Sequence, residues 1–136
     1  MAADGPDLVS KTPLRVWVLS DVQPGHYNQS RGVVSALRRI RPVQETWVTV
    51  RLRIGLGRNI LRLILNHTRM PLPSGLLKLF YEIDDFPDQG CDLIVSTGGK
   101  TSFANAWLAR RKNVPNIFVG SLRRLSPGHF SAVLTL

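Results

Sequence analysis

The sequence predicts an α/β fold in which a parallel β-sheet is covered by helices on its faces. Five short runs rich in β-branched and aromatic residues alternate with segments of helical periodicity, which is typical of βαβ units. The 136 residues, 43% hydrophobic and 20% charged, suffice for one domain with a buried core. We therefore expect a Rossmann-like domain over residues 13–136, preceded by a flexible tail at residues 1–12.

The first half of the chain carries four expected elements. Residues 14–20 form a β-branched and aromatic run that predicts a buried strand, and residues 45–52 alternate as a second strand does. Residues 59–67 are a helix candidate that is apolar on most sides. A further helix is expected over residues 29–40, ended by Pro42, because apolar residues recur at helical spacing, namely Val33, Val34, Leu37 and Ile40.

The second half continues the alternation. Residues 74–83 predict a helix, residues 91–99 a strand that ends in glycines, and residues 101–112 a helix closed by three cations. In that helix we expect four side chains to face inward: Phe103, Ala106, Trp107 and Ala109. Strands are expected at residues 116–121 and 131–136. Because the last strand runs to Leu136, we expect the chain to be the N-terminal part of a longer, two-domain protein.

The net charge of +9 is concentrated in one part of the chain. Residues 31–69 hold nine arginines and a single acid, Glu45, a local net charge of +8. Such a field favours an anionic partner, although a solvated basic face is the plain alternative. Nucleic acid is an unlikely partner, because no aromatic residue lies between Arg51 and Arg69 to stack on bases.

Several classes of protein and site are excluded. The chain begins with no apolar signal-peptide segment and holds no window long enough for a transmembrane helix. Its single cysteine, Cys91, rules out a disulfide framework and suits a reducing compartment, so we expect a cytoplasmic location. His67 and His129 lack partners at metal spacing, and the acids of residues 82–92 match no calcium loop. We expect no metal and no cofactor.

A loop rich in glycine and amide side chains follows the first strand, with the sequence SDVQPGHYNQSRG over residues 20–32. Gly25 can adopt unusual backbone angles, and Asp21, His26 and Gln29 can reach a ligand. If the helix starts near Gln29, its free N–H groups face the same crevice and favour an anion. The alternative is an ordinary turn with a polar cap. His26 is the candidate general base, although a hydrogen-bonding or structural histidine is the commoner role.

The third strand leads into a second glycine-rich turn, STGGKTS, over residues 96–102. It is not a phosphate loop, because Ile94 stands where that motif needs its first glycine. It nevertheless places small residues and hydroxyls at a helix start, where they can contact an anion or simply cap the helix. The candidate ligand-binding residues of this turn are Gly98, Gly99, Lys100, Thr101 and Ser102.

The segment of residues 51–70 mixes arginines with large aliphatic residues. This composition is typical of an interfacial segment that presses against anionic lipid. A core helix whose arginines extend outward is the commoner reading. The candidate membrane or anion patch comprises Arg51, Arg53, Arg58, Arg62 and Arg69.

Three segments, residues 20–37, 92–111 and 116–136, resemble the ELM family, named for a plant mitochondrial fission factor. Pro127, Phe130 and Val133 match a family pattern Pro-x-x-Phe-Asp-x-Val, in which Ser131 here replaces the Asp. The resemblance implies the N-terminal half of a GT-B-like protein, as in nucleotide-sugar glycosyltransferases. Residues 96–121 are also similar, more loosely, to the N-domain of the glycosyltransferase that makes the peptidoglycan lipid intermediate.

On this resemblance the N-domain holds the acceptor, and the missing C-terminal domain binds a nucleotide sugar. The two loops would line the interdomain cleft, and the basic segment would face a membrane. The implied partners are a nucleotide sugar or glycan acceptor, an anionic membrane surface and the missing domain, so the chain alone would be inactive. The alternative is a non-catalytic, membrane-associated or protein-interaction module of the ELM family.

Overall fold

The computed structural model describes residues 12–53, 55–68, 74–83, 90–122 and 125–135. They form an α/β domain built on a six-stranded sheet in the order β3-β2-β1-β4-β5-β6. The strands are β1 (Leu14–Ser20), β2 (Val43–Leu52), β3 (Tyr81–Ile83), β4 (Leu93–Thr97), β5 (Asn116–Val119) and β6 (Ala132–Leu134). All pairs are parallel except β2 with β3. The predicted α/β class with a mainly parallel sheet is confirmed, and the arrangement is Rossmann-like.

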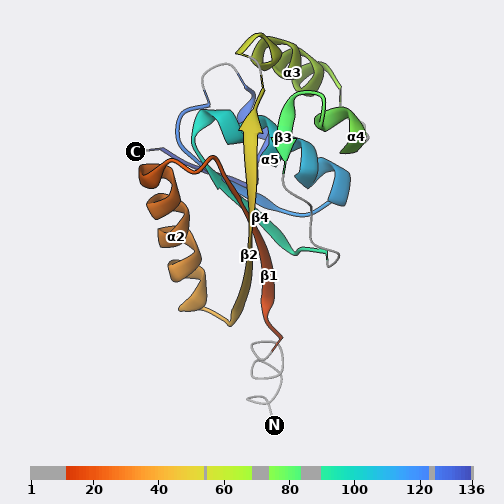
Figure 1. The fold of residues 1–136 in the computed structure, drawn as a ribbon. Coiled ribbons are helices and arrows are strands. Elements are labelled where there is room, and N and C mark those ends of the chain that lie inside the picture. Colours follow the sequence, from red (N-terminus) through yellow and green to blue (C-terminus); the bar gives the residue numbers. More distant parts are fainter. Residues whose placement is uncertain (1–11, 54, 69–73, 84–89, 123–124, 136) are drawn as a thin grey trace.

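Helices cover both faces of this sheet (Figure 1). Helix α2 (Pro24–Arg38) packs through Val34 on one face, against Val16, Val18 and Val95. Helix α5 (Gly99–Lys112) lies on the opposite face, and α3 (Gly55–His67) and α4 (Ser74–Leu77) pack on it. The two faces carry different helices because the chain leaves β1 and β4, which are neighbours at the centre of the sheet, toward opposite sides.

Helix α5 is covered on all sides from Thr101 to Ala109. The four residues expected to face inward are buried. The polar residues of this stretch, Thr101, Ser102 and Asn105, are buried as well. Asn105 donates to Ser96 Oγ at 2.8 Å and accepts from Asn116 Nδ2 at 2.9 Å. Asn116 Oδ1 in turn accepts from the Ser131 N–H at 3.0 Å. Since each of these buried groups has a partner, a helix with polar residues can occupy the interior.

Two expected elements differ from the structure. Helix α2 begins at Pro24 and not near Gln29, because proline suits the first turn, where its missing N–H is not needed. It also ends at Arg38, which leaves Ile40 77% exposed. The helix expected over residues 74–83 is only α4 followed by β3, because Tyr81 and Ile83 pair with the edge of β2 and Tyr81 is fully buried.

The acidic segment of residues 82–92 is described only at its ends. Glu82 is an exposed residue of β3, and residues 84–89 lie outside the described part of the chain. Asp92 accepts three hydrogen bonds from Arg15, from its backbone N–H, Nε and Nη2. These bonds hold the pKa of the Asp92 carboxyl below its ordinary value. This acid therefore joins the starts of β1 and β4 and is not part of a purely solvated loop.

The buried amide network makes a specific prediction about stability. Asn116→Ala removes the amide that donates to Asn105 Oδ1 and to the His129 carbonyl, so it should lower the free energy of unfolding by about 2–4 kcal/mol. Chemical denaturation followed by circular dichroism measures this change. Asn28→Ala, at an exposed position of α2, should change stability by less than about 0.5 kcal/mol. Equal effects of the two substitutions would contradict the role given to the network.

Candidate functional site

The candidate site lies at the carboxyl ends of β1 and β4, where the strand order reverses direction. In open α/β sheets ligands bind at this topological switch point, because the two following helices diverge and leave a crevice. Asp21 directly follows β1, and Gly98 directly follows β4. The structure thus brings both predicted loops to one rim of the sheet.

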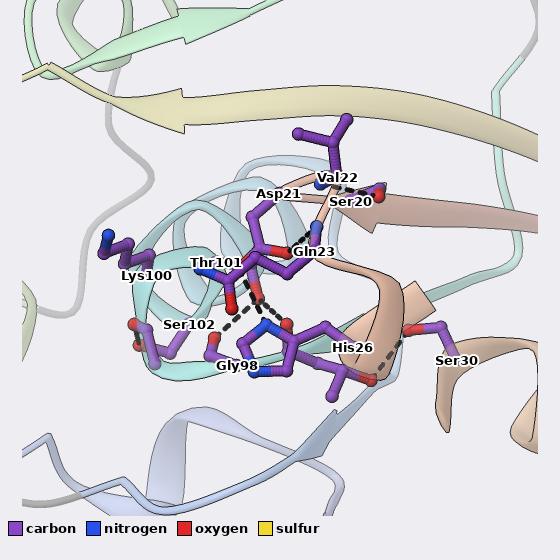
Figure 2. A network of polar contacts seen from close by, with 12 residues as sticks. Ser20, Asp21, Val22, Gln23, His26, Ser30, Gly98, Lys100, Thr101 and Ser102 are labelled. Carbon is purple, nitrogen blue, oxygen red and sulfur yellow. Dashed lines mark hydrogen bonds and ion pairs between the residues drawn. The ribbon is translucent and has the colours of Figure 1, made fainter. Parts of the chain in front are cut away.

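Asp21 and His26 form a hydrogen-bonded pair in this crevice (Figure 2). His26 Nδ1 lies 2.8 Å from Asp21 Oδ2, and the carboxylate is buried, with its side chain 6% exposed. Because an ionised carboxylate only accepts hydrogen bonds, the ring proton belongs on Nδ1. The neutral ring then carries its lone pair on Nε2, which has no protein partner among the described residues. The ring is 34% exposed and lines a cleft, so it can accept a proton from a ligand.

Gly98 allows the His26 ring to lie against the second turn. A Cβ atom at this position would lie 2.4 Å from His26 Nδ1 and Cε1. The backbone of Gly98 also has φ 95°, which side chains rarely permit. Its N–H donates to the Val119 carbonyl at 3.0 Å, which joins the turn to the end of β5. A glycine is therefore required here for two independent reasons.

A buried hydroxyl pair holds α2 on β4 one helical turn beyond His26. Ser30 Oγ lies 2.7 Å from Thr97 Oγ1, and both residues are buried. Since Thr97 precedes Gly98 and Ser30 follows His26 by four residues, this contact and the ring contact lie along one side of α2 (Figure 2). Together they set the position of His26 relative to the second turn.

Three candidate ligand residues do not line the cleft. Thr101 Oγ1 donates to the Gly98 carbonyl at 2.9 Å and Ser102 Oγ to the Gly99 carbonyl at 2.7 Å, and both residues are buried. Their hydroxyls therefore brace the turn, which fits the alternative of a capping role. Gly25 lies in the first turn of α2 with open space around it, so its freedom of backbone angle is not used.

The remaining candidates meet in a cleft with a volume of about 390 Å³. They are Asp21, His26, Gln29, Gly98, Gly99 and Lys100. Sequence reasoning missed Gln23 and residues 119–122, which span the end of β5 and the turn after it. This segment had a usable signal, because Gly120 and Ser121 follow an apolar strand as Gly98 and Gly99 do. Arg62 of α3 was expected in a membrane or anion patch, but its place in this cleft had no sequence signal, since it depends on how α3 packs.

The cleft is electropositive around the Asp21 carboxylate. Neither α2 nor α5 has a side-chain cap at its N-terminus, and neither has an acid in its first turn. The first residues of α5, Gly99 and Lys100, are exposed, so their N–H groups can reach a ligand. Arg62 also lines the cleft, and its Nε is buried without a hydrogen-bond partner in the described part of the chain. This surface can hold an anionic group next to a base.

The five arginines of the expected patch are spread over different parts of the structure. Arg51 is exposed on β2, and Arg53 Nε donates to the Lys78 carbonyl at 3.2 Å. Arg62 faces the cleft, whereas Arg69 and the side chain of Arg58 lie outside the described residues. Helix α3 buries Leu61 and Leu65 but leaves Ile60 45% and Leu63 59% exposed. It is thus a core helix on one face and apolar toward solvent on the other.

Two classes of site are not found in the described residues. No group of three histidine, cysteine, aspartate or glutamate side chains gathers there as a metal site would require. No helix within the described ranges is long and apolar enough to cross a bilayer. The fold and the cleft define an α/β domain with a histidine–aspartate pair and exposed helix N-terminal residues at its switch point. No family profile, curated protein or solved structure matches the chain.

Gly98 offers a direct test of the site geometry. Gly98→Ala should lower the free energy of unfolding by at least about 1–3 kcal/mol, because a side chain there is both strained and in contact with the His26 ring. Gly25→Ala is the matched control: with open space in a helix it should be neutral or stabilising by about 0.5–1 kcal/mol. Urea denaturation of both variants checks this. A Gly98→Ala protein as stable as the wild type would disprove the close approach.

Proposed function

We propose that this chain is the acceptor-side domain of a nucleotide-sugar-dependent, glycosyltransferase-like protein. The observation that carries the proposal is the Asp21–His26 pair, which lines a cleft at the switch point and engages the ring through Nδ1. The likeness of the two turns to the ELM family suggests the reaction class. The pair itself supports proton abstraction, which is what an acceptor hydroxyl requires.

In the proposed reaction, His26 Nε2 accepts the proton of an acceptor hydroxyl as the oxygen attacks the anomeric carbon of the donor sugar. The bond from that carbon to the nucleotide diphosphate breaks, and the diphosphate leaves with the electron pair. Asp21 stabilises the imidazolium that forms. The donor would be bound by a second domain, so the chain alone would bind acceptor without turnover.

The electropositive rim supports an acceptor that carries a phosphoryl group. The exposed N–H groups at the start of α5 can bind its oxygens, and Lys100 and Arg62 can neutralise its charge. The cleft of about 390 Å³ suits a sugar with a phosphate better than a large planar ligand, since the described walls offer one aromatic ring, Phe103.

His26→Gln in the full-length protein should lower kcat for nucleotide release from a nucleotide sugar by about 10²–10⁴-fold. The donor KM should hardly change, because the donor lies on the other domain. The matched control is His67→Gln, on an exposed position of α3, which should retain activity. Full activity of the His26→Gln protein, or no turnover of any nucleotide sugar by the wild type, would refute the proposal.

A second candidate function is membrane association through α3, favoured by the exposed aliphatic pair Ile60 and Leu63 beside Arg62. Replacing both aliphatic residues with serine should weaken binding to phosphatidylglycerol vesicles by roughly tenfold or more, because each side chain loses apolar burial in the lipid. Vesicle co-sedimentation measures this. Ile40→Ser, an exposed position two residues beyond the end of α2, is the control and should have no effect. Unchanged binding of the double variant would refute this function.

A further inference from the structure

Val22 lies in the short turn between the end of β1 at Ser20 and the start of α2 at Pro24, and its backbone is strained. Its φ is 62°, in the left-handed region that β-branched residues almost never adopt. Its side chain is 53% exposed, so no packing gain offsets the strain. Such outliers persist only where the surrounding contacts enforce them, and they gather at functional sites.

Two side chains enforce this turn. Ser20 Oγ accepts from the Val22 N–H at 3.2 Å, and Asp21 Oδ1 accepts from the Gln23 N–H at 3.2 Å. The second bond joins a carboxylate to the N–H two residues on, which is the pattern of an Asx turn. Figure 2 shows both bonds within the turn that links β1 to α2. Val22 is the central residue of this turn, so its backbone angle sets where the Asp21 carboxylate lies.

The same carboxylate also reaches His26. While Oδ1 holds the turn, Oδ2 lies 2.8 Å from His26 Nδ1. His26 is itself fixed from the other side, by its contact with Gly98 and by the Ser30–Thr97 bond one turn further along α2. A negative φ at Val22 would rotate Asp21 relative to a ring that cannot follow. The bond to Nδ1 therefore depends on the left-handed turn.

We propose that Val22 is a positioning residue: its left-handed turn holds the Asp21 carboxylate on His26 Nδ1 and so selects the ring tautomer that leaves Nε2 free toward the cleft. This inference rests on the proposed function only for the use made of Nε2. The positioning itself concerns the ligand-free protein. The hydrogen bonds of Asp21 hold Val22 in its left-handed conformation, and that conformation in turn holds the Asp21 carboxylate where it can make those bonds.

The test compares three substitutions at Val22 by ¹⁵N NMR of the His26 ring in the ligand-free chain, at a pH where the ring is neutral. The two ring nitrogens report which one carries the proton. Val22→Pro forces a negative φ and should shift the tautomer away from Nδ1–H, as Asp21→Asn should in a parallel measurement. Val22→Asn tolerates the left-handed region and should keep the wild-type tautomer.

Val22→Gly guards against a Pro variant that fails to fold. It keeps the N–H that Ser20 accepts and relieves the strain, but it frees the turn to other conformations, so the Nδ1–H population should fall between the wild-type and Asp21→Asn values. If folded Val22→Pro or Val22→Gly protein keeps the wild-type ring signals, or if Val22→Asn loses them, the inference is overturned.

Failure of this inference and failure of the proposed function are separable. The tautomer is read without substrate, whereas the role of the base is read from turnover by the His26→Gln protein. A tautomer that follows Val22 while His26→Gln stays active would retain the positioning and reject the reaction. If His26→Gln loses turnover but the tautomer does not respond to Val22, the reaction would be retained and the positioning role rejected.

Discussion

The contact between the His26 ring and Gly98 is the constraint on which the site depends. Parallel strands β1 and β4 are neighbours, and their following helices lead to opposite faces, so the two turns are forced to the same rim. A side chain on the second turn would occupy the place of the ring. The absence of one Cβ therefore leaves room for the imidazole, and the Asp21 carboxylate decides which of its nitrogens carries the proton.

Rigidity of the second turn comes from the interior. Helix α5 is buried from Thr101 to Ala109, and its Asn105 bonds to Ser96 of β4 and to Asn116 of β5. Asn116 bonds in turn to Ser131, just before β6. The start of α5 is thus fixed relative to β4, and its first N–H groups point out of a turn that cannot easily move. The first turn is less deeply anchored, because it depends on one carboxylate and on an exposed, strained valine.

The sheet could be predicted from the sequence because its central strands are short, strongly apolar runs between clear turn residues. Tyr81 to Ile83 was missed, since three residues at a sheet edge become a strand only through pairing with β2. Pro24 and Gly25 suggested a loop, yet proline also begins helices, and local residues do not decide between the two. The place of Thr101 and Ser102 could not be predicted, because a hydroxyl at a helix start serves a ligand or its own turn equally well. The two-domain organisation and the family resemblance stay predictions.

Arg62 joins the two surfaces that the chain offers to partners. It lines the cleft from α3, and on the same helix Ile60 and Leu63 point to solvent. A guanidinium with an unsatisfied buried Nε needs an anion or water near it, whereas the aliphatic pair needs an apolar partner. An acceptor with both a phosphoryl group and a hydrocarbon chain would satisfy the two needs at once, since the phosphate could lie on the α5 start while the chain crossed α3. A soluble sugar phosphate would leave the aliphatic pair exposed, so the effect of replacing Ile60 and Leu63 on acceptor affinity separates the two kinds of acceptor.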